Sequence, residues 1–129
     1  MMASCNEPQD RKTAVLSNNT ADSLILVKYK PAKDPQTIYI YAGQEGTLFE
    51  HDGGNWEGIT EAMDDYYDSL AVFYGETRIV FAPGYTQHYN SNPFTDFSKW
   101  EKRIEEFEED NNTIENTLYS FPVYADSIN

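Results

Sequence analysis

The feature that most constrains the fold is a pair of apolar runs joined by two residues. Ser69–Tyr74 and Thr77–Ala82 flank the dipeptide Gly75-Glu76. Glycine as the first of two turn residues is typical of a type II′ turn, which matches the twist of antiparallel strands. The resulting register gives three cross-strand pairs on one apolar face: Tyr74–Thr77, Val72–Ile79 and Leu70–Phe81. The two runs therefore predict a β-hairpin that packs one face on a core.

Runs with strand periodicity also occupy most of the remaining chain. They lie at 13–17, 23–30, 37–41, 47–51 and 117–128, with turn-rich segments between them. Pro122 interrupts the last run, which indicates an edge position or a bulge. Six or seven short strands predict a mainly β fold, a small antiparallel β-sandwich of immunoglobulin or transthyretin type.

The run 23–30 has an apolar face and a mixed face. Ile25, Val27 and Tyr29 share one side of the strand. The other side carries Leu24 and Leu26 first and then two lysines, at positions 28 and 30. We therefore expect the strand to begin buried on both sides and to end with its lysine side in water.

Two short helices are expected beside the strands. In the first, over residues 59–67, Ile59 and Met63 recur at helical spacing. The second is predicted over 98–107, because Ser98 and Glu101 form a capping box and Trp100 begins an apolar stripe at helical spacing.

The chain length suits one domain, which we place at residues 13–129, after a polar tether at residues 1–12. Nine basic residues against 22 acidic ones give a formal net charge of −13. Such a surface repels phosphate backbones, so no nucleic-acid partner is expected. The sequence has no apolar run long enough to span a bilayer as a helix.

Candidate catalytic and metal-binding groups are few. The two histidines are His51, in a loop with carboxylates and glycines, and His88. Neither has a nucleophile in a recognisable motif beside it, and the helical acids around Asp64 and Asp68 lack a calcium-loop pattern. We therefore expect no enzyme activity, no metal and no cofactor. The alternative is a small hydrolase that uses loop histidines and carboxylates.

Aromatic side chains are the best candidates for ligand contacts. The chain has ten Tyr, seven Phe and two Trp. Those in strand 37–41 and in the long loop after the hairpin could stack on a sugar or a peptide, or could instead cover the open ends of the sandwich. The possible ligand-binding aromatics are Tyr39, Tyr41, Tyr85, Tyr89 and Phe94.

Cys5 is the single cysteine of the chain, so it has no intramolecular partner. The preceding residues Met2, Ala3 and Ser4 resemble the end of a bacterial lipobox, in which small residues lead to a cysteine that is acylated. The apolar region of a signal peptide does not precede it in this sequence. A late start codon or trimming to the mature end would explain that difference, and the alternative is an incidental thiol.

A tripeptide that begins with Asp-Ser occurs three times, with its serine at Ser23, Ser69 and Ser127. It resembles the acceptor motif for O-glycosylation in the envelope of Bacteroidetes. Asp-Ser is also ordinary turn chemistry at the start of a strand.

The order of these motifs resembles that of small lipoproteins of Bacteroidetes, over residues 14–128. The segments that carry the likeness are 16–26, 40–50, 66–74, 92–100 and 119–128. The resemblance implies a β-rich domain anchored in the cell envelope by a lipid on Cys5. We therefore expect a non-enzymatic binding module with a protein or glycan partner. A cytosolic interaction domain is the remaining alternative.

Overall fold

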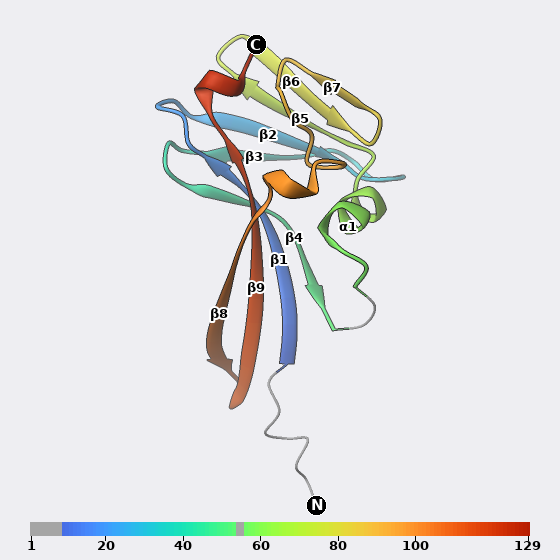
Figure 1. Ribbon diagram of the computed structural model, residues 1–129, viewed down its shortest axis with the longest axis vertical. Coiled ribbons are helices and arrows are strands. Elements are labelled where there is room, and N and C mark those ends of the chain that lie inside the picture. The colour runs from blue at the N-terminus through green and yellow to red at the C-terminus, as the bar shows by residue number, and fades with distance from the viewer. Residues whose placement is uncertain (1–8, 54–55) are drawn as a thin grey trace, which may run out of the picture.

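The computed structural model describes residues 9–53 and 56–129 and shows two β-sheets that share one core (Figure 1). One sheet has four strands in the order β4-β1-β9-β8, and the other has five in the order β3-β2-β5-β6-β7. The mainly β sandwich expected from the strand pattern is confirmed. The elements are β1 (Gln9–Asn18), β2 (Leu24–Tyr29), β3 (Gln36–Ile40), β4 (Glu45–Asp52), α1 (Ile59–Tyr66), β5 (Ser69–Tyr74), β6 (Thr77–Ala82), β7 (Tyr85–Gln87), β8 (Glu101–Glu109) and β9 (Asn112–Val123), with 3₁₀ turns at Phe97–Lys99 and Ala125–Ser127.

The β5–β6 hairpin forms in the register that its sequence predicts. Leu70 pairs with Phe81 and Val72 with Ile79, and all four side chains are fully buried. Gly75 has a φ of 58°, whereas Glu76 keeps a negative φ. This combination fits the expected type II′ turn, so the hairpin fixes the centre of the five-stranded sheet.

The four-stranded sheet is built around a parallel pair that the sequence did not predict. β1 and β9 come from opposite ends of the described chain, and Gln9 is the register partner of Ile114. Residues 9–12 therefore belong to β1, which corrects the expected tether boundary at residue 12. Parallel strands need a long connection, and here the rest of the domain supplies it.

The edge position expected at Pro122 exists locally, although β9 as a whole runs between β1 and β8 in its sheet. The pairing of β8 with β9 ends at Glu101 and Ser120. One side of β9 is therefore free at Pro122, and the missing amide hydrogen breaks no bond there.

The helix expected over 98–107 is also wrong, because most of this segment is strand β8. β8 pairs antiparallel with β9, and the turn between them places Asp110 and Asn111 at φ of 52° and 66°. Two successive residues with positive φ are typical of a type I′ turn. In the strand, Ile104 and Phe107 lie on opposite faces, so the apolar stripe of the expected helix does not exist.

A β-bulge in β4 provides a contact between the two sheets. Ala14 of β1 pairs with Phe49 and Val15 pairs with Thr47, so Leu48 opposes no residue of β1. The carbonyl of Leu48 accepts hydrogen bonds from the Tyr67 hydroxyl and from Lys28 Nζ, the latter at 3.3 Å.

Lys28 is buried in this contact, with 7% of its surface exposed. Its ammonium group also donates to the carbonyl of Thr47 at 3.2 Å. The expectation that the lysine side of β2 ends in water is therefore wrong at this residue. Leu24, Leu26 and Lys28 face the core, and desolvation lowers the pKa of Lys28.

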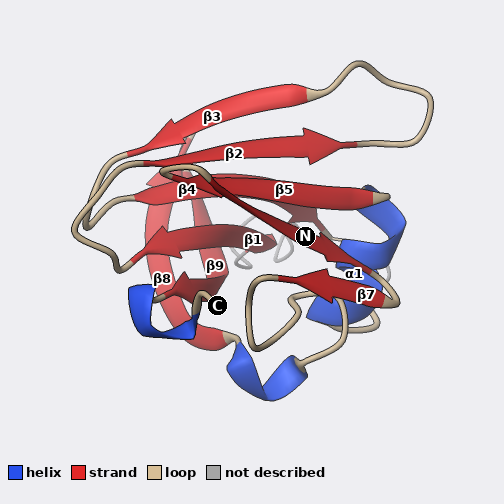
Figure 2. Ribbon diagram, turned by 90° about the horizontal axis from the view of Figure 1, so that it is seen from above, coloured by secondary structure: helices blue, strands red, loops and turns tan. Residues whose placement is uncertain are grey.

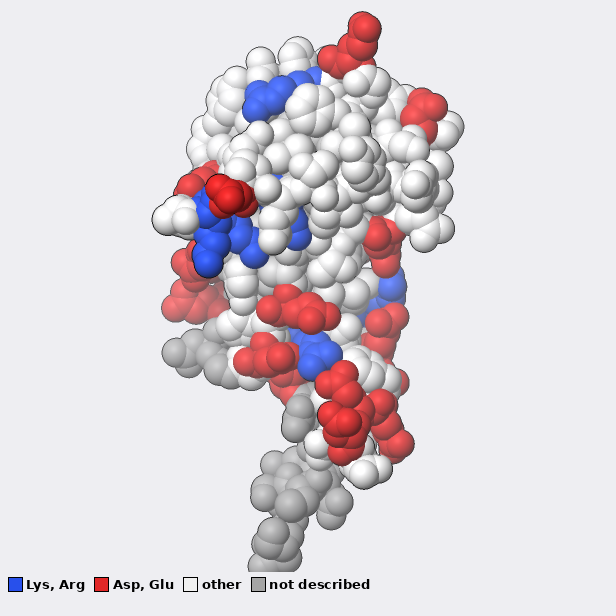
Figure 3. Space-filling view, turned by 180° about the vertical axis from the view of Figure 1, so that it is seen from behind, with Lys and Arg blue, Asp and Glu red and all other residues white. Residues whose placement is uncertain are grey.

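The long strands β1, β8 and β9 extend away from the five-stranded sheet toward the opposite end of the molecule (Figure 1). Every residue of β8 is exposed. Seen from behind, acidic side chains gather over this lower half, and the upper half is mostly uncharged (Figure 3). Within the described residues, helices of the length and hydropathy needed to cross a membrane are absent.

Candidate functional site

The aromatic residues selected from the sequence divide into two groups in the structure. Tyr39, Tyr41 and Tyr85 are 65%, 67% and 54% exposed, so they remain available to a partner. Tyr89 and Phe94 are only 6% and 4% exposed and belong to the core. Their selection as surface ligand contacts is therefore corrected.

Tyr89 is fixed in the core by hydrogen bonds. Its hydroxyl donates to the carbonyl of Pro122 at 3.1 Å and accepts from the amide of Tyr124 at 3.0 Å. Burial raises the pKa of Tyr89 above its ordinary value. This residue holds the loop after β7 against the end of β9.

The first candidate surface is the outer face of the five-stranded sheet, the face turned away from the core. Its members follow from the registers of the five strands, and each is half-buried or exposed except Ala71, which neighbouring side chains cover. Arg78 is the one Asp, Glu, Lys or Arg among them. The outer-face residues are Ile25, Val27, Tyr29, Thr37, Tyr39, Ser69, Ala71, Phe73, Arg78, Val80, Ala82, Tyr85 and Gln87.

The exposed tyrosines of this face do not form one stacking platform. Tyr39 lies on β3 and Tyr85 on β7, the two edge strands of the sheet. Four strand spacings separate these edges, or about 19 Å. The face between them is mostly apolar and includes the half-buried rings of Tyr29 and Phe73. Such a mixed apolar surface suits a protein better than a row of sugar rings.

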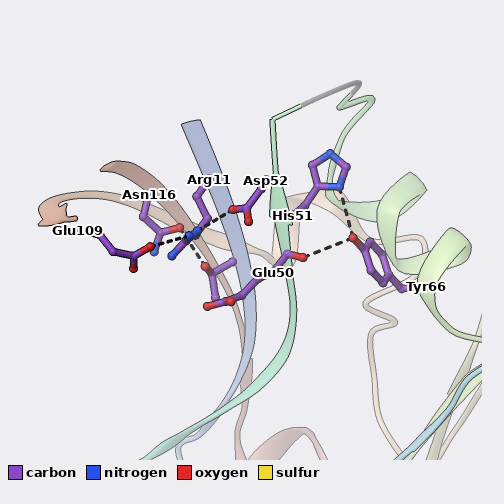
Figure 4. Close-up of polar contacts among 8 residues, drawn as sticks. Arg11, Glu50, His51, Asp52, Tyr66, Glu109 and Asn116 are labelled. Atoms are coloured by element: carbon purple, nitrogen blue, oxygen red, sulfur yellow. Dashed lines mark hydrogen bonds and ion pairs between the residues drawn. The ribbon is translucent and has the colours of Figure 1, made fainter. Parts of the chain in front are cut away.

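A second candidate lies between β4 and α1, where a pocket of about 200 Å³ opens beside His51. His51 Nδ1 lies 3.4 Å from the Tyr66 hydroxyl (Figure 4). The centre of the His51 ring lies 5.3 Å from that of Trp56. The Tyr66 ring stacks on Phe49 at 4.2 Å between ring centres. Glu61 also lines the pocket.

The sequence of α1 explains how this pocket is lined. Ile59 and Met63 are buried on one side of the helix, which turns Glu61 and Asp65 toward the pocket and solvent. Gly58 begins the helix with φ of 135°, a conformation that L side chains rarely adopt. Sequence reasoning found His51 but missed Tyr66, since the two are 15 residues apart and meet only in the fold.

The pocket does not provide the catalytic pair that a hydrolase would use. Within the described residues, neither histidine hydrogen-bonds to an Asp or Glu side chain: His51 Nδ1 lies near the Tyr66 hydroxyl, and His88 Nδ1 lies 3.0 Å from a backbone oxygen of Asn129. His51 Nε2 is buried without a hydrogen-bond partner in the same part of the chain. The described residues also contain no group of three or more acidic, histidine or cysteine side chains placed to hold a metal ion.

An ion-pair cluster occupies the other side of β4. Arg11 Nε lies 2.7 Å from a carboxylate oxygen of Asp52, and Arg11 Nη2 lies 3.5 Å from a carboxylate oxygen of Glu109 (Figure 4). Its guanidinium also lies 5.9 Å from the centre of the Phe107 ring. The hydrogen bond to Asp52 raises the pKa of Arg11 further above its ordinary value. The cluster ties β1, β4 and β8 together at the far end of the sheet, which is a structural role.

The serines proposed for glycosylation differ in exposure. Ser23 is exposed before β2, while Ser69 and Ser127 are half-buried at the start of β5 and in the last 3₁₀ turn. Their modification stays a prediction. Cys5 lies outside the described residues.

Comparison of the chain with protein-family models, curated proteins and solved structures gave no match.

Proposed function

We propose that this protein is a cell-envelope lipoprotein, anchored by a lipid on Cys5, that binds a protein partner without catalysing a reaction. The residues Met2-Ala3-Ser4-Cys5 support the anchor because they resemble the end of a lipobox. The net charge of −13 suits a soluble envelope domain that is kept off anionic surfaces except through its anchor.

The observation that carries the proposal is that the N-terminal strand and the five-stranded sheet lie at opposite ends of the molecule (Figure 1). β1 begins at Gln9 at one end of the molecule, and the five-stranded sheet lies at the other end (Figure 1). An anchor attached four residues before Gln9 would therefore leave the outer face of that sheet turned away from the membrane. Arg78 is the single charged residue of this outer face, which is otherwise uncharged.

The character of that face favours a protein partner over a glycan. Apolar surface of this kind, bordered by polar residues, commonly marks protein contacts. A glycan platform would need aromatic rings side by side, whereas Tyr39 and Tyr85 lie on opposite edges of the sheet.

The anchor is tested by fractionating cells that express the protein from its own gene with the upstream DNA. We expect the wild-type chain in the membrane fraction and Cys5→Ser in the soluble fraction. Ser4→Ala, a small change beside the cysteine, is the matched control and should stay with the membrane. A wild-type chain found wholly in the soluble fraction would contradict the anchor and favour the cytosolic interaction domain.

The binding face is tested by placing a photo-crosslinking amino acid at Arg78, in the outer face, or at Glu106, on the exposed strand β8. We expect crosslinks to one discrete protein from position 78 and not from position 106. Equal crosslinking from both positions, or none from either, would contradict the assignment of this face.

A further inference from the structure

Each sheet ends in two edge strands, which are β4 and β8 in one sheet and β3 and β7 in the other. An edge strand carries unpaired backbone groups that another strand can join, and proteins usually protect it with charges or by keeping it short. Seven of the nine residues of β8 are charged. β4 carries Glu45, Glu50 and Asp52, and β7 has only three residues.

β3 has none of these protections. Its sequence Gln-Thr-Ile-Tyr-Ile contains no charged residue. The nearest charges along the chain are Asp34 before it and Glu45 after it. Figure 2 shows β3 along the free side of its sheet, with no other described strand beyond it. Tyr39 and the following Tyr41 expose 65% and 67% of their surface beside this edge.

We propose that β3 pairs antiparallel with β3 of a second copy of this chain, which joins the two five-stranded sheets into one. A twofold axis through Ile38 overlaps the whole strand and places Tyr39 of each copy opposite Thr37 of the other. The pairing is self-complementary, as a twofold interface must be, and it keeps the outer faces of both copies on the same side.

Charge disfavours the edges at β4 and β8, and β7 is too short, so a second copy would meet at β3. Each copy carries a formal charge of −13, so contact between copies is opposed by repulsion over most of the surface. Pairing through β8 would bring its five glutamates close to the five of the other copy. At β3 no charged side chain of the strand faces its equivalent, and repulsion is smallest.

The available area implies a weak dimer in solution. A tyrosine side chain offers roughly 200 Å², so Tyr39 and Tyr41 of two copies, at 65% and 67% exposed, offer about 500 Å² together. Even with the strand backbones, the interface lies near or below the roughly 1,200 Å² at which stable complexes begin. Confinement to a membrane, which rests on the proposed function, would raise the effective concentration.

The test is sedimentation of the full, unacylated chain over a wide concentration range, with a reducing agent to prevent a disulfide through Cys5. We expect the wild-type chain to dimerise reversibly and Tyr39→Lys to weaken the dimer by at least about tenfold. Tyr85→Lys is the matched control, because it makes the same change on the opposite edge of the same face. It should dimerise at least as strongly as the wild type.

The direction of the charge change sharpens this test. Both variants make the net charge less negative, so general electrostatics would strengthen association in both. Selective loss in Tyr39→Lys therefore supports pairing through β3. A monomeric wild type at every concentration, or equal dimerisation of the two variants, would overturn it. If circular dichroism shows that Tyr39→Lys is unfolded, Thr37→Lys at the exposed neighbouring position replaces it with the same expected result.

Discussion

The Leu48 carbonyl, which accepts hydrogen bonds from two different elements, leads to a prediction about coupling between residues. The Tyr67 hydroxyl and Lys28 Nζ both donate to it, and the bulge in β4 removes it from pairing with β1. We expect the double variant Tyr67→Phe, Lys28→Met to lose more stability than the two single variants together.

The magnitude follows from what each variant leaves behind. Tyr67→Phe removes one hydrogen bond and costs about 1 kcal/mol, since Lys28 still satisfies the carbonyl. Lys28→Met removes bonds of 3.2 and 3.3 Å but also relieves the burial of a charge, so its net cost lies within about 1 kcal/mol of zero. The double variant alone leaves the Leu48 carbonyl without either donor, which costs about 1–3 kcal/mol more.

The assay is urea denaturation of the wild type, both single variants and the double variant. A coupling energy of at least about 1 kcal/mol is expected, and additivity within about 0.5 kcal/mol would refute the reasoning. Tyr66→Phe combined with Lys28→Met is the control pair. The Tyr66 hydroxyl bonds the carbonyl of Glu50 instead, so this pair should be additive.

Three further outcomes are expected. Burial raises the pKa of Tyr67 and Tyr89 above the ordinary 10.0, so above about pH 10 the unfolded chain loses protons that the folded chain keeps, and stability falls as pH rises. Tyr67→Phe should reduce the loss of unfolding free energy above about pH 10, measured by urea denaturation, by up to about 1.4 kcal/mol per pH unit. An unchanged slope would contradict the raised pKa of Tyr67. Gly46→Ala should cost about 1–3 kcal/mol because its Cβ would lie 2.5 Å from Ile40 Cδ1, whereas Gly84→Ala, with no atom within 4 Å, should stay within about 0.5 kcal/mol; equal melting temperatures would contradict this. In hydrogen exchange, the exposed strand β8 should lose protection before the buried strand β5, and the reverse order would contradict the assigned packing.

Local signals predicted the fold where neighbouring residues set the structure. The β5–β6 hairpin could be read to single-residue register because Gly75 fixes the turn and the apolar pattern fixes the face. The helix α1 could also be predicted from the sequence, since Ile59 and Met63 recur at helical spacing. Both elements depend on contacts within about ten residues, which a single sequence displays.

Three features that the sequence did not predict depend on contacts between distant residues. The capping box Ser98–Glu101 leads into β8, but pairing of β8 with β9 along its whole length outweighs that local preference. The partnership of Gln9 with Ile114 in the β1–β9 pair has no local signal at all. Lys28 looked like a surface residue because its partner, the carbonyl of Leu48, is freed by a bulge in another sheet.

The candidate surfaces could likewise be predicted only in part from the sequence. Tyr39, Tyr41 and Tyr85 were selected from the sequence and are exposed, whereas Tyr89 and Phe94 are buried by the packing of the loop after β7. The outer face as a whole could not be predicted, since its residues come from five strands whose order depends on nonlocal pairing.

The central claim, an envelope lipoprotein anchored at Cys5, is tested most directly by the intact mass of the native protein from fractionated cells. The protein must be expressed from its own gene with the upstream DNA. We predict a membrane-associated species that begins at Cys5 and carries the added mass of a diacylglycerol group and acyl chain. A soluble species that retains Met1 or Met2 and carries no lipid would contradict the account.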